Sequence, residues 1–140
     1  MRRPLLPIAL LALALAGCGG DDENGDAKPA TAASFIECFE KPGFEAVEPK
    51  PREESVLAFQ AKAKGYAVEP VNVQEDGALT PHAFIVFFES GEKATEAMKE
   101  LRASSLGSVA PQKLGPAVIG YGDEENRAAV EPAIEDCLAP

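Results

Sequence analysis

Ala83-Phe84-Ile85-Val86-Phe87-Phe88 is an unbroken run of six apolar residues in a chain of 140 residues. A short apolar run that is rich in β-branched and aromatic residues is typical of a strand covered on both faces. Because side chains alternate along a strand, Ile85 and Phe87 point away from the other large residues of the run. The sequence therefore predicts a central strand over residues 82–89, with an apolar layer on each side of it.

The segments around this run alternate between strands and helices. Strands are expected over residues 44–48, 66–73 and 117–121, and helices over residues 51–64 and 91–102. Together with the central strand, these elements follow the order βαββαβ, which is the order of a ferredoxin-like fold. We therefore expect the α+β class, with a ferredoxin-like βαββαβ sandwich that carries extra N- and C-terminal helices.

Pro70 agrees with the same topology. It interrupts the second expected strand, and proline has no backbone N–H to donate to a neighbouring strand. A ferredoxin-like sheet places its second strand at an edge and its third strand in the centre. The two helices between the strands should cover one face of the sheet through two stripes of apolar residues. These stripes are Val56, Phe59 and Ala63, broadened by Leu57, in the first helix, and Ala94, Ala97, Met98 and Leu101 in the second.

Two more helices are expected at the ends of the domain. Ser34, or alternatively Thr31, can cap a short helix over residues 35–41. A final helix, capped by Asp123 or Asn126, carries apolar residues at helical spacing. The two terminal helices would therefore flank the βαββαβ core.

Cys38 and Cys137 fall on these terminal helices. In an oxidising compartment, an isolated pair of cysteines is expected to form a structural disulfide. Free thiols, a metal site and a redox pair are the alternatives. A metal site would need further ligands, and His82 is the only histidine, while a redox pair usually has Cys-x-x-Cys spacing. We therefore predict a disulfide between Cys38 and Cys137 and no metal site.

The face of the sheet that carries Ile85 and Phe87 needs a cover, because a two-layer ferredoxin-like fold leaves one face open and this face is too apolar for water. The disulfide-linked terminal helices can cover it, which predicts a compact monomer. A homodimer partner or a ligand in an apolar pocket can cover it instead. Ile85 and Phe87 are therefore the candidate residues of an apolar binding or packing face.

The N-terminus has the layout of a secretory signal. Two arginines precede an apolar stretch over residues 4–14, and Leu15-Ala16-Gly17 then places small residues before Cys18. This segment resembles the lipobox of bacterial lipoproteins, Leu-(Ala/Ser)-(Gly/Ala)-Cys. The resemblance implies that residues 1–17 are removed and that Cys18 becomes a lipidated N-terminus, thioether-linked to diacylglycerol. A soluble secreted protein and an uncleaved anchor are the alternatives, although the apolar stretch is shorter than the roughly 20 residues that span a bilayer.

The chain is expected to have three parts. Residues 1–17 are the signal peptide, residues 18–33 form an acidic tether that follows the lipidated cysteine, and residues 34–140 form a single small domain. Removal of the signal peptide takes Arg2 and Arg3 away, so the formal net charge changes from −10 to −12. This charge argues against nucleic acid and against anionic lipid as partners of the folded part.

Motifs for catalysis are missing from the sequence. The chain has no Gly-x-Ser-x-Gly, no His-Glu-x-x-His and no phosphate-binding glycine loop. Asp123-Glu124-Glu125 is typical of a helix N-terminus, and the acidic run over residues 21–26 lacks the ligand spacing of a calcium loop. We expect no enzyme, and no cofactor apart from the covalent lipid on Cys18.

The expected role is a non-enzymatic binding or scaffold domain of the cell envelope. The lipid anchor would hold it at the cell membrane, facing the extracytoplasmic side. A protein partner or a homodimer is compatible with this role. The alternatives are a solute-binding or sensory module with an apolar pocket on the sheet face, and a thiol-redox protein.

Overall fold

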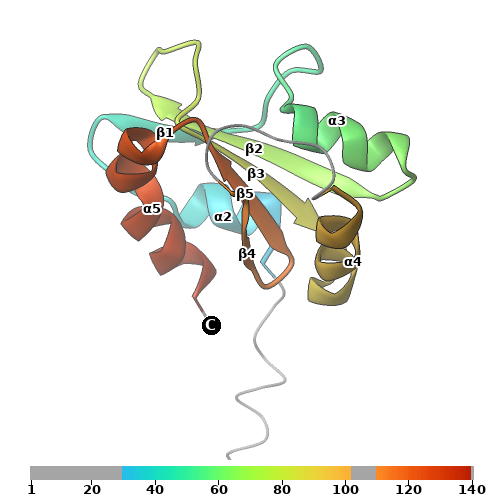
Figure 1. Ribbon diagram of the computed structural model, residues 1–140. Helices are drawn as coiled ribbons and strands as arrows, with labels where there is room; N and C mark the ends of the chain where they lie inside the picture. The colour runs from blue at the N-terminus through green and yellow to red at the C-terminus, as the bar shows by residue number, and fades with distance from the viewer. Residues whose placement is uncertain (1–29, 102–109, 140) are drawn as a thin grey trace, which may run out of the picture.

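A five-stranded antiparallel sheet forms the centre of the computed structural model, which describes residues 30–101 and 110–139 (Figure 1). The helices of this part of the chain are α2 (Ala32–Cys38), α3 (Val56–Ala63), α4 (Gly91–Leu101) and α5 (Glu124–Leu138). The strands are β1 (Phe44–Val47), β2 (Val68–Glu75), β3 (Ala83–Phe88), β4 (Gln112–Leu114) and β5 (Ala117–Tyr121). The α+β class is therefore confirmed. Within the described ranges, no helix has the length and apolar character needed to cross a membrane.

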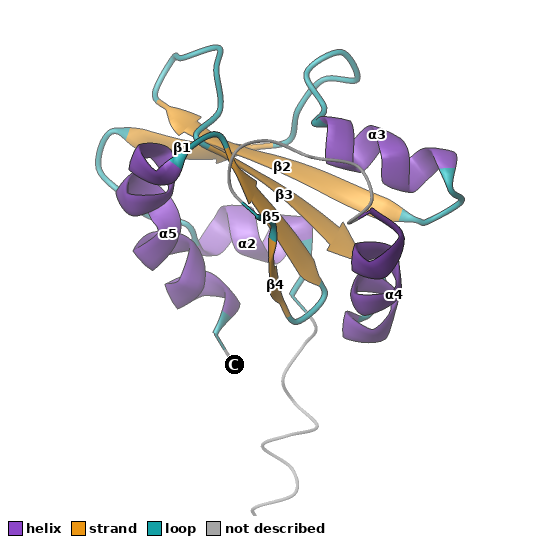
Figure 2. Cartoon of the chain, viewed as in Figure 1, coloured by secondary structure: helices purple, strands orange, loops and turns teal. Residues whose placement is uncertain are grey.

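The sheet lies between two layers of helices (Figure 2). α3 and α4 cover one face, where Val86 and Phe88 are buried, and α2 and α5 cover the other face, where Ile85 and Phe87 are buried. β3 is the middle strand of the sheet, as its apolar run predicts. Its two apolar faces belong to two separate hydrophobic clusters, so this one strand holds both halves of the core together.

The strand order is β1-β2-β3-β5-β4, and it differs from the ferredoxin-like order. A ferredoxin-like sheet would place the first strand in the centre, next to the third, whereas β1 lies at the outer edge beside β2. The composition of β1 explains its place. It is short and half-buried, and Glu45 accepts a hydrogen bond from the side-chain amide of Gln74 at 3.1 Å. A central strand would have to bury this carboxylate, which is costly.

β4 was not expected from the sequence. Gln112, Lys113 and Leu114 carry no alternating apolar pattern, yet they pair with β5 in an antiparallel hairpin. Gly115 has a φ of 57°, which L side chains rarely adopt, and together with Pro116 it makes the tight turn between Leu114 and Ala117. This hairpin completes the sheet on the side opposite to β1.

Pro70 lies within β2, opposite Val86 of β3. β1 pairs only with residues 72–75 of β2, so Pro70 lies where β2 has no strand on its other side. The prediction of an edge strand is therefore right for the first half of β2 and wrong for the strand as a whole. The missing N–H of Pro70 costs the sheet no ladder bond on this open side.

The terminal helices begin at caps that the sequence contains. α2 starts after Thr31, the earlier of the two expected caps, because Thr31 and Ser34 form a reciprocal capping box. The expectation of Ser34 as the N-cap is corrected to this supporting role. α5 starts after Asp123, whose carboxylate accepts the N–H of Asn126 at 2.7 Å. Pro132 lies inside α5.

The buried face of α3 differs from the expected one. The helix begins at Val56, after the N-cap Ser55, and not at residue 51. Val56 and Phe59 are 61% and 69% exposed, respectively. Leu57, which was expected to broaden the stripe, does face the sheet, together with Ala58 and Ala61. Because α3 is apolar on almost every side, its periodicity does not select one face, and the small alanines allow the closest approach to the sheet.

The expected stripe of α4 is found at three of its positions. Ala94, Ala97 and Met98 are buried against β3 and β5, while the side chain of Leu101 lies outside the described part of the chain. α4 begins after Ser90, whose hydroxyl oxygen accepts the N–H of Lys93 at 3.1 Å. The helix therefore starts where its capping residue predicts.

Candidate functional site

Cys38 and Cys137 are joined by a disulfide, with their Cα atoms 5.7 Å apart across 99 residues of chain. The bond links the last residue of α2 to the last turn of α5, so the predicted disulfide is confirmed. Cross-links over loops of this length stabilise a fold by up to roughly 4–5 kcal/mol in the chain-entropy model. Cys18, the predicted lipidation site, lies outside the described residues.

Ile85 and Phe87 are 0% and 2% exposed. The ring of Phe87 packs on that of Phe35 from α2, with 5.8 Å between the ring centroids, and Val130 and Ile134 of α5 belong to the same cluster. The terminal helices thus fill the space over this sheet face within one chain. The structure gives Ile85 and Phe87 a packing role in the core.

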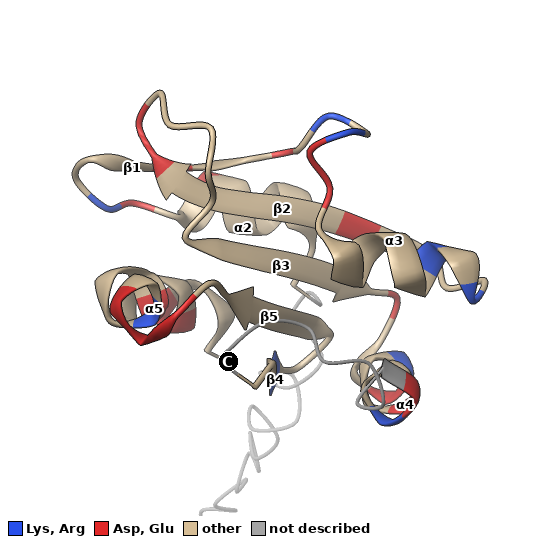
Figure 3. Cartoon of the chain, turned by 45° about the horizontal axis from the view of Figure 1, so that its top comes forward, with Lys and Arg blue, Asp and Glu red and all other residues tan. Residues whose placement is uncertain are grey.

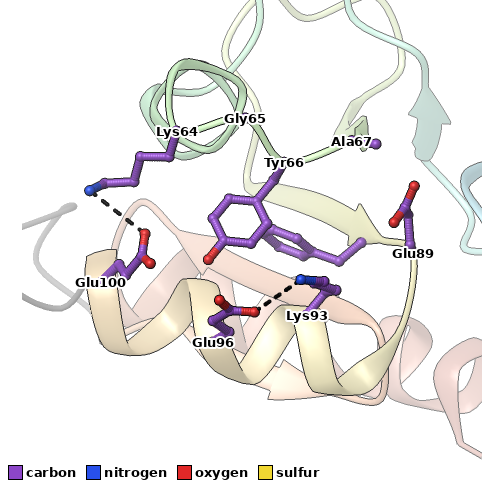
Figure 4. A pocket seen from close by; sticks show the side chains of 9 residues that line it. Lys64, Gly65, Tyr66, Ala67, Glu89, Lys93, Glu96 and Glu100 are labelled. Carbon is purple, nitrogen blue, oxygen red and sulfur yellow. Dashed lines mark hydrogen bonds and ion pairs between the residues drawn. The ribbon is translucent and has the colours of Figure 1, made fainter.

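A polar groove of about 370 Å³ lies between the end of α3 and α4 (Figure 4). Tyr66 forms its wall, packed edge-on against Phe88 with ring centroids 5.6 Å apart. Lys64, at the end of α3, forms an ion pair with Glu100 of α4 at 3.7 Å, so this pair crosses the groove. Lys93 and Glu96 form a second ion pair within α4, at 3.2 Å. The cations of the groove are therefore already partnered by carboxylates of α4.

Both titratable side chains of this groove whose pKa is shifted hold their protons more tightly than usual. Burial, followed by the charges of Glu100 and Glu96, raises the pKa of Tyr66 above its ordinary value. Hydrogen bonding to Glu96 raises the pKa of Lys93. At neutral pH, Tyr66 is therefore a neutral phenol and Lys93 a cation, and neither is a general base.

A second groove, of about 320 Å³, lies where the described chain enters the domain. It is bordered by Ala30, Thr31, Val68 and Phe87. The edge of Phe87 reaches this groove although the residue is almost wholly buried. This groove therefore lies at the end of the sheet, beside the predicted apolar face.

Tyr121 belongs to a polar cluster between β5 and α5. It is 3% exposed, and its hydroxyl has no hydrogen-bond partner among the described residues. Burial, with a smaller effect of Glu131, raises the pKa of Tyr121 to about 12. The guanidinium of Arg127 lies over the tyrosine ring and binds both carboxylate oxygens of Glu131, at 2.5 and 3.0 Å. This hydrogen bonding to Arg127 lowers the pKa of Glu131, so the carboxylate stays ionised at neutral pH.

The other residues that the sequence singled out have structural partners. Asp123 caps α5, as expected for an acidic helix start. The ring of His82 packs edge-on against Phe44 at 5.1 Å, and its Nε2 lies 3.8 Å from a carboxylate oxygen of Glu75. Over residues 30–101 and 110–139, the structure brings together no group of three or more His, Cys, Asp and Glu side chains that could hold a metal ion.

Neither the groove beside Tyr66 nor the exposed face of α3 was expected from the sequence. The groove depends on how α3 and α4 lie beside each other, which no local pattern encodes. Searches of family models, of curated proteins and of solved structures found no match to this chain.

Proposed function

We propose that this protein is a lipoprotein of the bacterial cell envelope, with a non-enzymatic binding or scaffold domain. Residues 1–17 would be removed, Cys18 would carry the diacylglycerol, and residues 18–33 would tether the domain to the extracytoplasmic side of the membrane. The lipobox residues Leu15-Ala16-Gly17-Cys18 are the starting point of this proposal.

The observation that carries the proposal is the pairing of the cysteines. The chain has 3 cysteines, and two of them, Cys38 and Cys137, are joined to each other. Cys18 therefore has no cysteine left in the chain with which to pair. A single cysteine directly after a signal-like segment is the residue that lipoprotein processing requires.

The disulfide supports the same compartment by an independent route. Structural disulfides form and persist outside the reducing cytoplasm. The lipobox, at one end of the chain, and the disulfide, within the folded domain, both favour an extracytoplasmic location. Two features with different chemistry therefore favour the same location.

The described side chains support binding rather than catalysis. His82, Asp123 and the two bonded cysteines each have a structural partner, as described above. The buried phenol of Tyr121 has a raised pKa and is not poised to exchange a proton near neutral pH.

Fractionation of cells that express the full chain tests the proposal. The wild-type protein should be found in the membrane fraction and enter the detergent phase on extraction. The Cys18→Ser variant should remain unprocessed and carry no acyl label. The Cys38→Ser/Cys137→Ser variant is the matched control, because it removes the other two thiols and should still be acylated. Acylation of the Cys18→Ser variant would overturn the proposed anchor.

A further inference from the structure

The outer face of α3 is apolar and open to solvent. Val56 and Phe59 are 61% and 69% exposed, and they lie three residues apart on the same side of the helix. The opposite side of α3 packs on the sheet through Leu57, Ala58 and Ala61. Val56 and Phe59 therefore form a small apolar surface that no described part of the chain covers.

Basic residues lie before and at the end of α3, with Glu53 and Glu54 between Arg52 and the helix. Four of the 13 lysine and arginine residues of the chain fall within residues 50–64, which contain only two acidic residues. α3 is also the one helix of the described ranges that contains no acidic residue. Figure 3 shows the basic residues gathered before α3 and at its end. They are Lys50, Arg52, Lys62 and Lys64.

The side chains at the two ends of α3 differ in their pairing. Lys62 forms an ion pair with Glu54 at 2.6 Å, and Lys64 lies 3.7 Å from Glu100. The side chains of Lys50 and Arg52 are exposed and have no ion-pair partner among the described residues. They can therefore meet an anionic surface without first breaking a contact within the domain.

The chain enters the described domain near the C-terminal end of α3. The backbone N–H of Ala32 donates to a carboxylate oxygen of Glu69 at 3.3 Å, so the entering chain lies beside the start of β2. α3 ends at Ala63, only a short connection before β2 begins at Val68. When fully extended, residues 18–29 span at most about 40 Å, which keeps the domain next to the bilayer.

We propose that the outer face of α3 rests on the anionic lipid bilayer that holds the acyl chains of Cys18. This inference depends on the proposed lipid anchor. Val56 and Phe59 would enter the headgroup region, while Lys50 and Arg52 would meet anionic headgroups. The contact is small, but a tether raises the effective concentration of the membrane so far that a weak contact is sufficient.

The acidic charge of the rest of the domain determines which face of the domain meets the membrane. Without residues 1–17, the chain has a formal net charge of −12, which anionic lipid repels. The outer face of α3 is the apolar side with a local excess of positive charge, so it can approach the membrane with the least repulsion. The whole-chain charge argues against general docking on anionic lipid, and this one face is the exception.

A single tryptophan can report on this contact, because the chain contains no tryptophan. The acylated full chain would be prepared as a Phe59→Trp variant and reconstituted into phosphatidylcholine vesicles, with and without phosphatidylglycerol. Leu79→Trp is the matched control, because Leu79 is 93% exposed and lies after β2, at the end of that strand opposite to the chain entry. Brominated acyl chains in the vesicles quench only a ring that enters the bilayer.

In vesicles with phosphatidylglycerol, the Phe59→Trp emission should shift to the blue and lose about half of its intensity to brominated lipid, since interfacial helices lie roughly 5–10 Å below the headgroup boundary. The Leu79→Trp emission should keep the position and intensity of a ring in water. Replacing Lys50 and Arg52 by glutamate should reduce the quenching of the Phe59→Trp variant. Because all these side chains are exposed, the variants should have the same melting temperature as the wild type.

Three results would overturn the inference. Phe59→Trp protein that floats with the vesicles but is not quenched would leave the anchor intact and remove the contact. A blue shift without quenching that grows with protein density would show that a second copy covers α3. Protein that does not float with the vesicles would remove the anchor, and the inference with it.

Discussion

The ring of Phe35, on α2, packs against the ring of Phe87, on the central strand, with 5.8 Å between their centroids. This contact joins the first described helix to the middle of the sheet. The disulfide at the end of the same helix fixes α2 to α5. The sheet face that carries Ile85 and Phe87 is therefore covered by α2 and α5, the first and the last helix of the described domain.

Phe35→Ala should destabilise the domain strongly, because it opens a cavity over the sheet. The expected loss in the free energy of unfolding is about 3–5 kcal/mol, measured by urea denaturation. Phe59→Ala is the matched control, since Phe59 is 69% exposed and should change stability by less than about 1 kcal/mol. Equal losses for the two variants would contradict the packing described for Phe35.

Ile85→Asp should unfold the domain or cost several kcal/mol, because it places an unpaired charge in a fully buried position. Circular dichroism during a thermal melt measures the effect. Leu79→Asp adds the same charge at an exposed position and should melt with the wild type. A folded and soluble Ile85→Asp protein that melts near the wild-type temperature would show that this face is a surface.

The Cys38→Ser/Cys137→Ser variant should lose up to about 4–5 kcal/mol of stability, because its unfolded chain is no longer closed into a loop of that length. Reductant should lower the melting temperature of the wild type and leave that of the variant unchanged. Comparison of the two proteins by calorimetry, with and without reductant, measures this. A wild-type protein whose stability does not respond to complete reduction would be inconsistent with the structural role of the bond.

Tyr121→Phe should keep or raise the stability of the domain at neutral pH, by up to about 1 kcal/mol, because it removes a buried hydroxyl without a partner in the described residues. The pKa of Tyr121 is raised to about 12 in the fold, mainly by burial, and is near 10 in the unfolded chain. The unfolded state therefore ionises first as the pH rises, and the wild type loses stability from about pH 10 upward.

The advantage of the Tyr121→Phe variant should accordingly grow between about pH 10 and pH 12. Urea denaturation of both proteins at neutral and alkaline pH measures the difference. Tyr66→Phe is the comparison variant, because Tyr66 is the second of the two tyrosines of the chain and is half-buried in the groove beside α4. A difference between wild type and Tyr121→Phe that is constant with pH would mean that the Tyr121 phenol ionises as it does in water.

The sequence predicted those features that depend on local composition. The run over residues 83–88 can be stable only where both of its faces are buried, and it forms the middle strand of the sheet. Thr31 and Asp123 mark helix starts because their side-chain oxygens accept a hydrogen bond from a backbone N–H only three residues further along the chain. The pairing of Cys38 with Cys137 was predicted because disulfides are stable in an oxidising compartment and because these two cysteines remain once Cys18 is assigned to the lipid.

The strand order could not be predicted in the same way. A local pattern identifies β1 as a strand but does not say which strand it pairs with, and its partner lies at residues 72–75, far along the chain. The prediction of the buried face of α3 was wrong for Val56 and Phe59, because a helix that is apolar on nearly every side can pack on the sheet through several of its faces. The groove beside Tyr66 depends on the relative placement of two helices and has no local signal.

The proposed lipid anchor is tested most directly by the intact mass of the mature protein extracted from membranes and alkylated without reductant. We expect a chain that begins at Cys18, carries a diacylglycerol, and takes up no alkylating reagent at Cys38 or Cys137. After reduction, the same chain should take up reagent at Cys38 and Cys137 alone. An unmodified mass, or a chain in which Cys18 is a free alkylatable thiol, would contradict the account.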